Sequence, residues 1–152
     1  ANTSSISDGA SAIVLANSKY AEDINITPVA YLVGHARHSL KPNDFTLAPI
    51  DAVKKLACKL NWDLEDVDLF EINEAFAMVT ILAMRELNID HSKVNVFGGA
   101  CAQGHPIGST GSKIIVTLVN ALLGLGKNRG IASLCIGGGE AIAIAIEIPS
   151  HD

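Results

Sequence analysis

A glycine-rich segment, GGACAQGHPIGSTG at residues 98–111, contains a single histidine, His105. Glycine lets a backbone approach a ligand closely or adopt a positive φ, so an imidazole in this setting is a candidate for chemistry. Two further candidates lie far away along the chain: Asn73 in NEAFA, and Cys135, which stands two residues before Gly137 in CIGGGEAIA. A histidine, an amide, a thiol and successive glycine N–H groups suit a reaction at a thioester or ketone carbonyl.

Each of these groups also has a simpler structural use. An imidazole can activate a nucleophile, but His105 can equally be an ordinary loop histidine. A thiol acts as an acid or base once a positive neighbour or backbone N–H groups lower its pKa, whereas a cysteine at the end of an apolar strand, such as Cys135, is often a core residue. Asn73 can hold an imidazole or a water, or it can cap a helix. The glycines 137–139 can form an oxyanion hole or only a hairpin turn, so the residue types leave both alternatives open.

The elements before these groups determine where they lie. Apolar runs predict strands at residues 9–17, 26–38, 67–72 and 93–99, and two strands joined across three glycines at 130–149. Helical periodicity predicts helices at 48–62, 73–87 and 111–126, with Asn73 as the N-cap of the second. This alternation predicts one α/β domain with a mainly parallel sheet and helices on its faces.

The predicted strand ends bring the candidate groups together. In sheets of parallel strands, chemistry gathers at the carboxyl ends, where strand passes to helix. Asn73, His105 and Cys135 each follow or end a predicted strand, although about thirty residues separate each from the next. We therefore expect the three side chains to meet in one pocket.

Composition excludes several classes of protein. The chain has 152 residues, a net charge of −5 and 18% charged residues, which is typical of a globular domain and not of a disordered chain or a nucleic-acid binder. Three cysteines without regular spacing argue against a disulfide framework, so we expect a reducing compartment and a cytoplasmic protein. We expect no membrane partner, because no secretory signal pattern is present and the most apolar stretch, residues 114–125, is too short to span a bilayer.

A metal site and a dinucleotide loop both fit the sequence poorly. His35 and His38 lie three positions apart on a predicted strand and so point to opposite faces, where they cannot bind one metal ion together. The segment GGACAQG lacks the Gly-x-Gly-x-x-Gly spacing of a dinucleotide loop. We therefore expect no metal ligands and no resident cofactor.

Three motifs in this order resemble the C-terminal signatures of the thiolases, namely NEAFA (73–77), GGACAQGHPIGSTG (98–111) and CIGGGEAIA (135–143). Thiolases comprise the acetyl-CoA acetyltransferases and the 3-ketoacyl-CoA thiolases. The opening ANTSSISDGASAIVL resembles the start of the same half, so the likeness extends over nearly the whole chain. Thiolases have two similar α/β halves, and the resemblance implies that residues 1–152 form the C-terminal domain, with a mainly parallel, mixed, five-stranded sheet and helices on its faces. The absence of an initiator methionine agrees with a fragment, a processed product or one half of a larger protein.

The resemblance implies a role for each catalytic candidate. His105 matches the histidine that activates the nucleophilic cysteine and donates to the thioester oxygen, and Asn73 matches the residue that holds a water in that oxyanion hole. Cys135 matches the acid/base that removes the α-proton of acetyl-CoA, and Gly137 matches a backbone donor of the second oxyanion hole. In the family the nucleophile belongs to the N-terminal half, which we expect to be absent here. The other two cysteines, Cys58 and Cys101, do not match it and are expected to be packing residues.

The resemblance also implies a coenzyme A site. Ser4 matches a serine that contacts the pantetheine, Phe76 lines the tunnel, and Phe45 stands where it can reshape the acyl pocket. Ser5 and Ser7 replace the glycine and asparagine usual in the family, which weakens the coenzyme A assignment at this end of the chain.

The expected function is that of the C-terminal half of an acyltransferase. It would catalyse Claisen condensation of acetyl-CoA or thiolytic cleavage of 3-ketoacyl-CoA, in fatty acid metabolism, with coenzyme A thioesters as substrates. The expected partners are the N-terminal thiolase half and further copies in a homodimer or homotetramer. Two alternatives stay open: a 3-ketoacyl synthase relative, although those enzymes place two histidines at the site and lack the second cysteine, and a non-catalytic half domain that binds coenzyme A or a partner.

Overall fold

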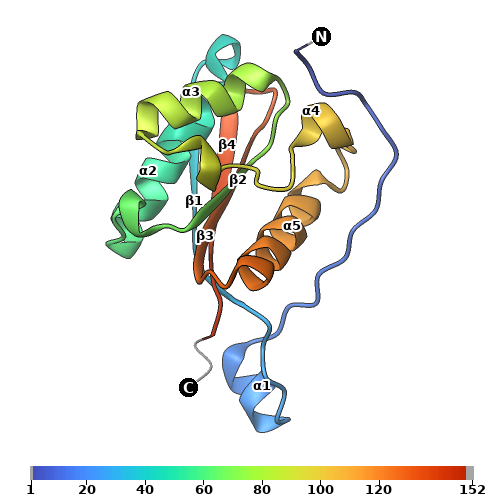
Figure 1. The fold of residues 1–152 in the computed structure, drawn as a ribbon, viewed down its shortest axis with the longest axis vertical. Coiled ribbons are helices and arrows are strands. Elements are labelled where there is room, and N and C mark those ends of the chain that lie inside the picture. The colour runs from blue at the N-terminus through green and yellow to red at the C-terminus, as the bar shows by residue number, and fades with distance from the viewer. Residues whose placement is uncertain (1, 150–152) are drawn as a thin grey trace.

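A computed structural model of the chain describes residues 2–149 (Figure 1). Ala1 and residues 150–152, which the predicted domain 1–152 includes, lie outside the described residues. The helices and strands follow in the order α1 Ser18–Asp23, β1 Tyr31–Ser39, α2 Ala48–Leu60, β2 Leu69–Ile72, α3 Ala77–Leu87, α4 Ala100–Gln103, α5 Thr110–Leu125, β3 Arg129–Cys135 and β4 Glu140–Glu147. Short 3-10 helices lie at Pro42–Asp44, Leu64–Asp66 and His91–Lys93.

The described strands form one four-stranded sheet in the order β1-β4-β3-β2. β2 pairs with β3 in parallel, whereas β4 is antiparallel to both β1 and β3. The α/β class is confirmed, but the expectation of a mainly parallel sheet is wrong. β3 and β4 are the two strands predicted within 130–149, and a connection as short as residues 136–139 can join only antiparallel neighbours.

The expected five strands are not found among the described residues, because Asn95 interrupts the predicted strand 93–99. This segment makes only an isolated parallel bridge between Val94 and Phe70. Asn95 has φ +48°, which turns the backbone out of the extended region. Its carboxamide instead accepts the N–H of Ile72 and donates to the Ile72 carbonyl, both at 2.8 Å. One side chain thus pairs with the outer edge of β2 in place of a strand.

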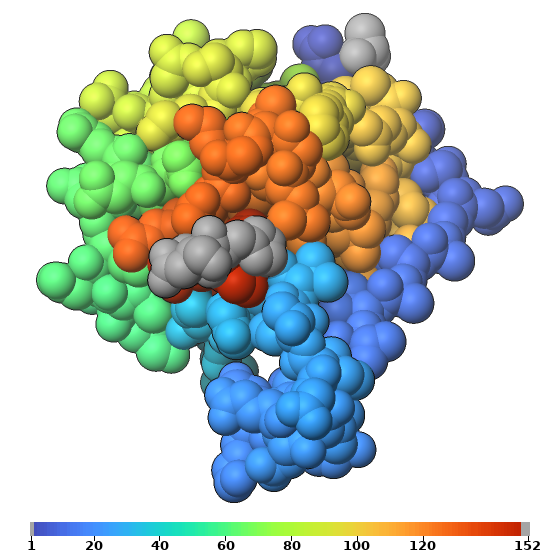
Figure 2. Space-filling view, turned by 60° about the horizontal axis from the view of Figure 1, so that its bottom comes forward, coloured from blue at the N-terminus to red at the C-terminus, as the bar shows by residue number. Residues whose placement is uncertain are grey.

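The predicted strand at residues 9–17 is also wrong. The segment runs along the outside of the molecule past α5 (Figure 1), and a helix has no free ladder with which a strand can pair. Val14 is 96% exposed, and contact with α5 is made through the Ser11 hydroxyl, which donates to the carbonyl of Ser109 at 3.0 Å. The helix α1 that follows was not predicted, and it protrudes from the body as a lobe (Figure 2). The strand predicted at 26–38 begins only at Tyr31.

Helices cover both faces of the sheet, with α2 and α3 on one side and α5 on the other (Figure 1). The helices predicted at 48–62 and 111–126 are confirmed as α2 and α5, and their apolar faces are buried, as Leu56 (0% exposed) and Leu118 (1%) show. Both end in a left-handed residue, Asn61 and Gly126, which satisfies the last carbonyls. None of the helices in the described part of the chain combines the length and the apolar character needed to cross a membrane.

The helix predicted at 73–87 begins later, at Ala77, with Phe76 at the N-cap. Asn73 is therefore not the cap. Its N–H donates to the Ser133 carbonyl at 2.9 Å and extends the β2–β3 ladder by one residue, so the chain stays extended there. The N-terminal segment also binds this stretch, because the N–H of Ala77 donates to the carbonyl of Asn2 at 3.0 Å.

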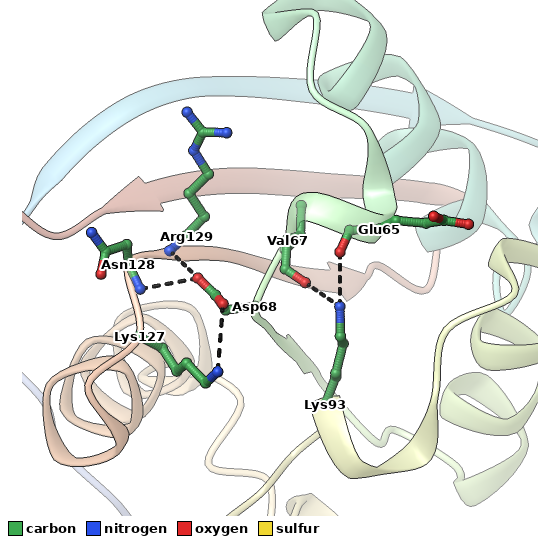
Figure 3. A network of polar contacts seen from close by, with 7 residues as sticks. All are labelled: Glu65, Val67, Asp68, Lys93, Lys127, Asn128 and Arg129. Atoms are coloured by element: carbon green, nitrogen blue, oxygen red, sulfur yellow. Dashed lines mark hydrogen bonds and ion pairs between the residues drawn. The ribbon is translucent and has the colours of Figure 1, made fainter.

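A polar network fastens the opposite end of the sheet, where β2 and β3 begin (Figure 3). The Asp68 carboxylate accepts the backbone N–H groups of Asn128 and Arg129 at 3.0 and 2.9 Å, and the Lys127 ammonium lies 3.9 Å away. Burial raises the pKa of Asp68, but the two N–H donors and the nearby lysines lower it by more, so the net shift is downward. Lys93 donates to two carbonyls of the turn before β2 at 2.9 Å. These bonds set the register in which β2 and β3 start.

Candidate active site

Two of the predicted site residues lie at the same end of the sheet. Asn73 directly follows β2 and Cys135 is the last residue of β3. The two strands are parallel, with Ile72 opposite Ser133, so their carboxyl ends coincide. Asn73 is 3% exposed and Cys135 is 8% exposed. Antiparallel neighbours elsewhere in the sheet do not disturb this convergence, because β2 and β3 are the one parallel pair of the described sheet.

The N-terminal segment brings His105 to this end as well. The N–H of His105 donates to the Ser5 carbonyl at 2.9 Å, and the N–H of Ser4 donates to the carbonyl of Ala75 at 3.3 Å. Residues 4 and 5 therefore lie between His105 and the stretch that begins with Asn73. That the side chains of Asn73, His105 and Cys135 share a single pocket stays a prediction.

Thr110 determines which nitrogen of His105 carries the proton. The His105 Nδ1 atom lies 2.7 Å from the Thr110 hydroxyl oxygen, and that hydroxyl donates its proton to the carbonyl of Pro106 at 2.9 Å. Because a hydroxyl has only one proton, donation to Pro106 matches the tautomer in which Nδ1–H donates to Thr110 and Nε2 keeps a lone pair. Burial, and then the positive charge of Lys113, lower the pKa of His105. The imidazole is thus a neutral base with Nε2 available.

Glu74 ties the histidine loop to the end of β2. Its carboxylate accepts the N–H of Cys101 at 3.0 Å, at the start of α4, and lies 3.4 Å from the carboxamide nitrogen of Asn95. A Cβ on Gly99 would overlap this carboxylate, so any other residue at that position would displace the Glu74 side chain. Sequence reasoning missed Glu74, and its place beside Asn73 in NEAFA was the one available signal.

The thiol of Cys135 is in its acid form at neutral pH. Burial raises the pKa of Cys135, and a hydrogen bond with its own backbone offsets this only in part. A positive neighbour or backbone N–H groups would lower the pKa of a thiol, but at Cys135 burial dominates and the net shift is upward. A protonated thiol at the end of β3 can donate a proton, which is one half of an acid/base role.

Gly137 lies in the turn between β3 and β4. Two backbone hydrogen bonds close the turn. The N–H of Gly139 donates to the carbonyl of Ile136 at 3.0 Å, and the N–H of Ile136 donates to the backbone carbonyl of Glu140 at 2.7 Å. The prediction that two strands are joined across these glycines is thus confirmed. Gly137 itself is exposed at the tip, two residues after Cys135. Its role as a backbone donor stays a prediction.

The predicted coenzyme A residues form one cluster. The rings of Phe45 and Phe76 meet edge to face, with centroids 6.2 Å apart, and Phe76 remains 40% exposed. Thr3 forms an antiparallel bridge with Phe76. The hydroxyl of the next residue, Ser4, donates to the carbonyl of Ala75 at 3.1 Å. Residues 4, 45 and 76 are far apart in sequence, and the fold brings them together beside Asn73.

Two buried polar atoms at this end lack a partner among residues 2–149: the Nδ2 atom of Asn73 and the hydroxyl oxygen of Ser7. Ser7 lies against Gly104, where a Cβ would overlap its side chain. Buried polar groups without a partner are rare in proteins and indicate a water or a ligand. The orphaned amide of Asn73 therefore marks a position where a small polar molecule can bind.

A buried carboxyl group, Glu71 on β2, was not predicted. It is 6% exposed, and burial raises its pKa to about 8, although Lys113 lowers it and Glu74 raises it further. Cys58 and Cys101, expected as packing residues, are exposed instead, because they lie on the outer sides of α2 and α4. The described residues contain no group of three or more His, Cys, Asp and Glu side chains that could hold a metal ion.

The chain is similar in sequence to known acyltransferases. Residues 26–148 match the C-terminal domain of thiolases. The cytosolic acetyl-CoA acetyltransferase of Mus musculus is 45% identical over 147 residues, and the match covers 97% of this chain and 37% of that protein. The chain thus spans little more than a third of the length of the curated relatives it matches.

Solved structures show the same fold. The acetyl-CoA acetyltransferase of Bacillus anthracis superposes with a TM-score of 0.95 at 41% identity, over 97% of this chain and 38% of that chain. A thiolase of Ascaris suum in complex with coenzyme A gives a TM-score of 0.84 at 42% identity, over 88% of this chain and 35% of that chain.

Proposed function

The chain belongs to the thiolase family, and we propose that it is the C-terminal catalytic half of an acetyl-CoA acetyltransferase. It supplies a histidine, an asparagine and an acid/base cysteine for the condensation of acetyl-CoA or the thiolytic cleavage of 3-ketoacyl-CoA. The observation that carries the proposal is the convergence of Asn73, His105 and Cys135 at one end of the sheet, although the motifs are separated in sequence. The similarity to acetyl-CoA acetyltransferases, one of them cytosolic, supports it.

The first step is acylation of a cysteine in the N-terminal half that thiolases possess. The lone pair on Nε2 of His105 accepts the proton of that thiol, because Nδ1–H is bound to Thr110. The cysteine sulfur then bonds to the acetyl carbon, the thioester C–S bond breaks, and coenzyme A leaves as a thiol with the proton from His105. The lowered pKa of His105 keeps the imidazole unprotonated and ready for this transfer. The free amide of Asn73 donates to a water that stabilises the negative charge on the thioester oxygen.

The second step uses Cys135. As a thiolate, it removes the α-proton of the second acetyl-CoA, and as a thiol it returns a proton to the enolate leaving group in cleavage. The raised pKa of Cys135 makes the thiol the resting form, so condensation requires the thiol proton to leave first. The exposed N–H of Gly137 stabilises the enolate oxygen at the hairpin tip.

Coenzyme A binds beside the N-terminal segment in this proposal. Phe45 and Phe76 present an aromatic pair to the pantetheine, with Ser4 next to them. The coenzyme A complex of the Ascaris suum relative supports this assignment. The whole enzyme would act in the cytoplasm, in fatty acid metabolism.

The N-terminal thiolase half is the proposed partner, with homodimers or homotetramers of the complete enzyme. The extended segment before α1 exposes apolar side chains that its own chain does not cover: Ile6 is 88% exposed and Val14 is 96% exposed. Ile107, in the histidine loop, is 68% exposed. A second α/β half would remove this apolar surface from water, which favours association.

The test is Cys135→Ala in the complete enzyme, with Cys58→Ala as the matched control because Cys58 is exposed on α2. We expect Cys135→Ala to be acetylated by radiolabelled acetyl-CoA but to form acetoacetyl-CoA at a rate lower by about 10²–10⁴-fold, the usual contribution of a general acid/base. Cys58→Ala should keep both steps. Acetoacetyl-CoA formation at the wild-type rate by Cys135→Ala would contradict the mechanism and make Cys135 a packing residue.

A further inference from the structure

Lys113, in the first turn of α5, holds the backbone immediately before His105. Its ammonium donates to the carbonyl of Gly104 at 3.1 Å in a half-buried position. Gly104 has φ +88°, and a Cβ there would overlap Ser7. The peptide that leads into His105 is therefore confined on one side by Ser7 and bound on the other by Lys113.

The charge of Lys113 is not cancelled at neutral pH. The carboxyl group that Lys113 acts on is Glu71 on β2, which Glu74 also influences. Because burial raises the pKa of Glu71 to about 8, its carboxyl group is mostly protonated and neutral in the pH range in which histidines titrate. Glu74 accepts the N–H of Cys101 and forms no ion pair with Lys113 among the described residues. The ion pairs formed within residues 2–149 do not include Lys113, so its positive charge acts on the histidine loop.

We propose that Lys113 is a positioning residue for the catalytic histidine: its ammonium clamps the Gly104 carbonyl and places a positive charge near the His105 imidazole. The clamp keeps Nε2 aimed at its target, and the charge disfavours the imidazolium. The positive charge is the second cause, after burial, of the lowered pKa of His105. Lys113 does not touch the reacting atoms and acts only through His105. This inference rests on the proposed function in that His105 is taken as the base.

The proposal is tested by the titration of His105 in the complete enzyme, followed by NMR of ¹³C-labelled histidine. The resonance is assigned by its loss in His105→Gln. Lys113→Met removes the charge and the donor, and Lys113→Gln keeps a donor for the Gly104 carbonyl while removing the charge. We expect His105 to titrate at a higher pH in both variants, and at the wild-type pH in Lys113→Arg. Should Lys113→Met fail to fold, Lys113→Gln makes the same measurement.

The matched control is Lys54→Met, which makes the same charge change on the exposed side of α2, across the sheet from α5. It should leave the titration of His105 unchanged. The acid limb of the pH profile for acylation of the nucleophile should move to higher pH in Lys113→Gln, in parallel with the NMR titration.

A purely structural lysine would lower stability without moving the titration. An unchanged His105 titration in Lys113→Gln would therefore overturn the proposal, as would an equal shift in Lys54→Met. The titration needs no turnover, so it stands apart from the acylation and condensation assays of Cys135→Ala. Failure of the thiolase proposal would appear in those assays with the His105 shift intact.

Discussion

Glu71→Gln should stabilise the chain at alkaline pH. The Glu71 carboxyl is 6% exposed, and burial raises its pKa from 4.5 to about 8. Between these two values the folded state binds more protons than the unfolded state, so unfolding releases a proton and stability falls as pH rises. Gln has nearly the shape of the protonated glutamic acid but carries no charge at any pH, so it removes this loss.

The pKa difference sets the upper limit of the effect. Each unit corresponds to about 1.4 kcal/mol, so a shift from 4.5 to about 8 corresponds to a stabilisation of at most about 5 kcal/mol above pH 8. The value of about 8 already includes the opposing effect of Lys113, and relaxation of the site around the charge reduces the stabilisation further. We expect a gain of about 2–4 kcal/mol at pH 9 and almost none at pH 4.5.

Urea unfolding from pH 4.5 to 9 measures this gain for the 152-residue chain. Glu86→Gln, on the exposed side of α3, is the matched control and should not alter the pH dependence. The free energy of unfolding of the wild type should fall between pH 5 and 8. That of Glu71→Gln should fall less and lie about 2–4 kcal/mol higher at pH 9. If the two proteins differ equally at pH 4.5 and pH 9, Glu71 is ionised inside the fold at no cost and the reasoning is refuted.

Two further substitutions test the ends of β2. Asp68→Ala removes the acceptor of two backbone N–H groups and should cost about 1–3 kcal/mol of stability at pH 7 in urea unfolding. Since the pKa of Asp68 is lowered in the fold, its contribution is present above pH 3.8 and should vanish as pH falls through the folded value; a constant gap down to pH 2 would contradict this. Asn95→Ala leaves the N–H and carbonyl of Ile72 without their partner and puts alanine at φ +48°, so we expect a loss of about 2–4 kcal/mol, against less than about 0.5 kcal/mol for the exposed Asn120→Ala. A loss as small as that of the control would show that Asn95 does not substitute for a strand.

Local patterns predicted the long helices and the order of the motifs. The 3.6-residue periodicity of 48–62 and 111–126 was sufficient for α2 and α5, because a helix satisfies its hydrogen bonds within one segment. The apolar alternation of 140–147 similarly predicted a covered strand. The convergence of Asn73 and Cys135 at one end of the sheet also followed from the sequence, since both end strands that a crossover makes parallel.

Strands need a partner, and only the tertiary structure decided which segments found one. Residues 9–17 have a strand-like composition but run beside a helix, so they stay unpaired, and the edge of β2 is bound by the side chain of Asn95 where a strand was expected. Asn73 is a residue type that often caps a helix, yet its N–H donates to the carbonyl of Ser133 on the neighbouring strand β3.

The sequence by itself determined the chemical inventory of the site and the family to which it belongs, because three motifs in order specify both. Only the tertiary structure determined the protonation states of the titratable side chains at the site. The tautomer of His105 depends on Thr110, the neutral Glu71 depends on burial between β2 and α5, and the position of the histidine loop depends on Glu74 and Lys113. Burial and hydrogen-bond partners set a pKa, and both arise from residues that are distant in sequence and meet only in the folded chain.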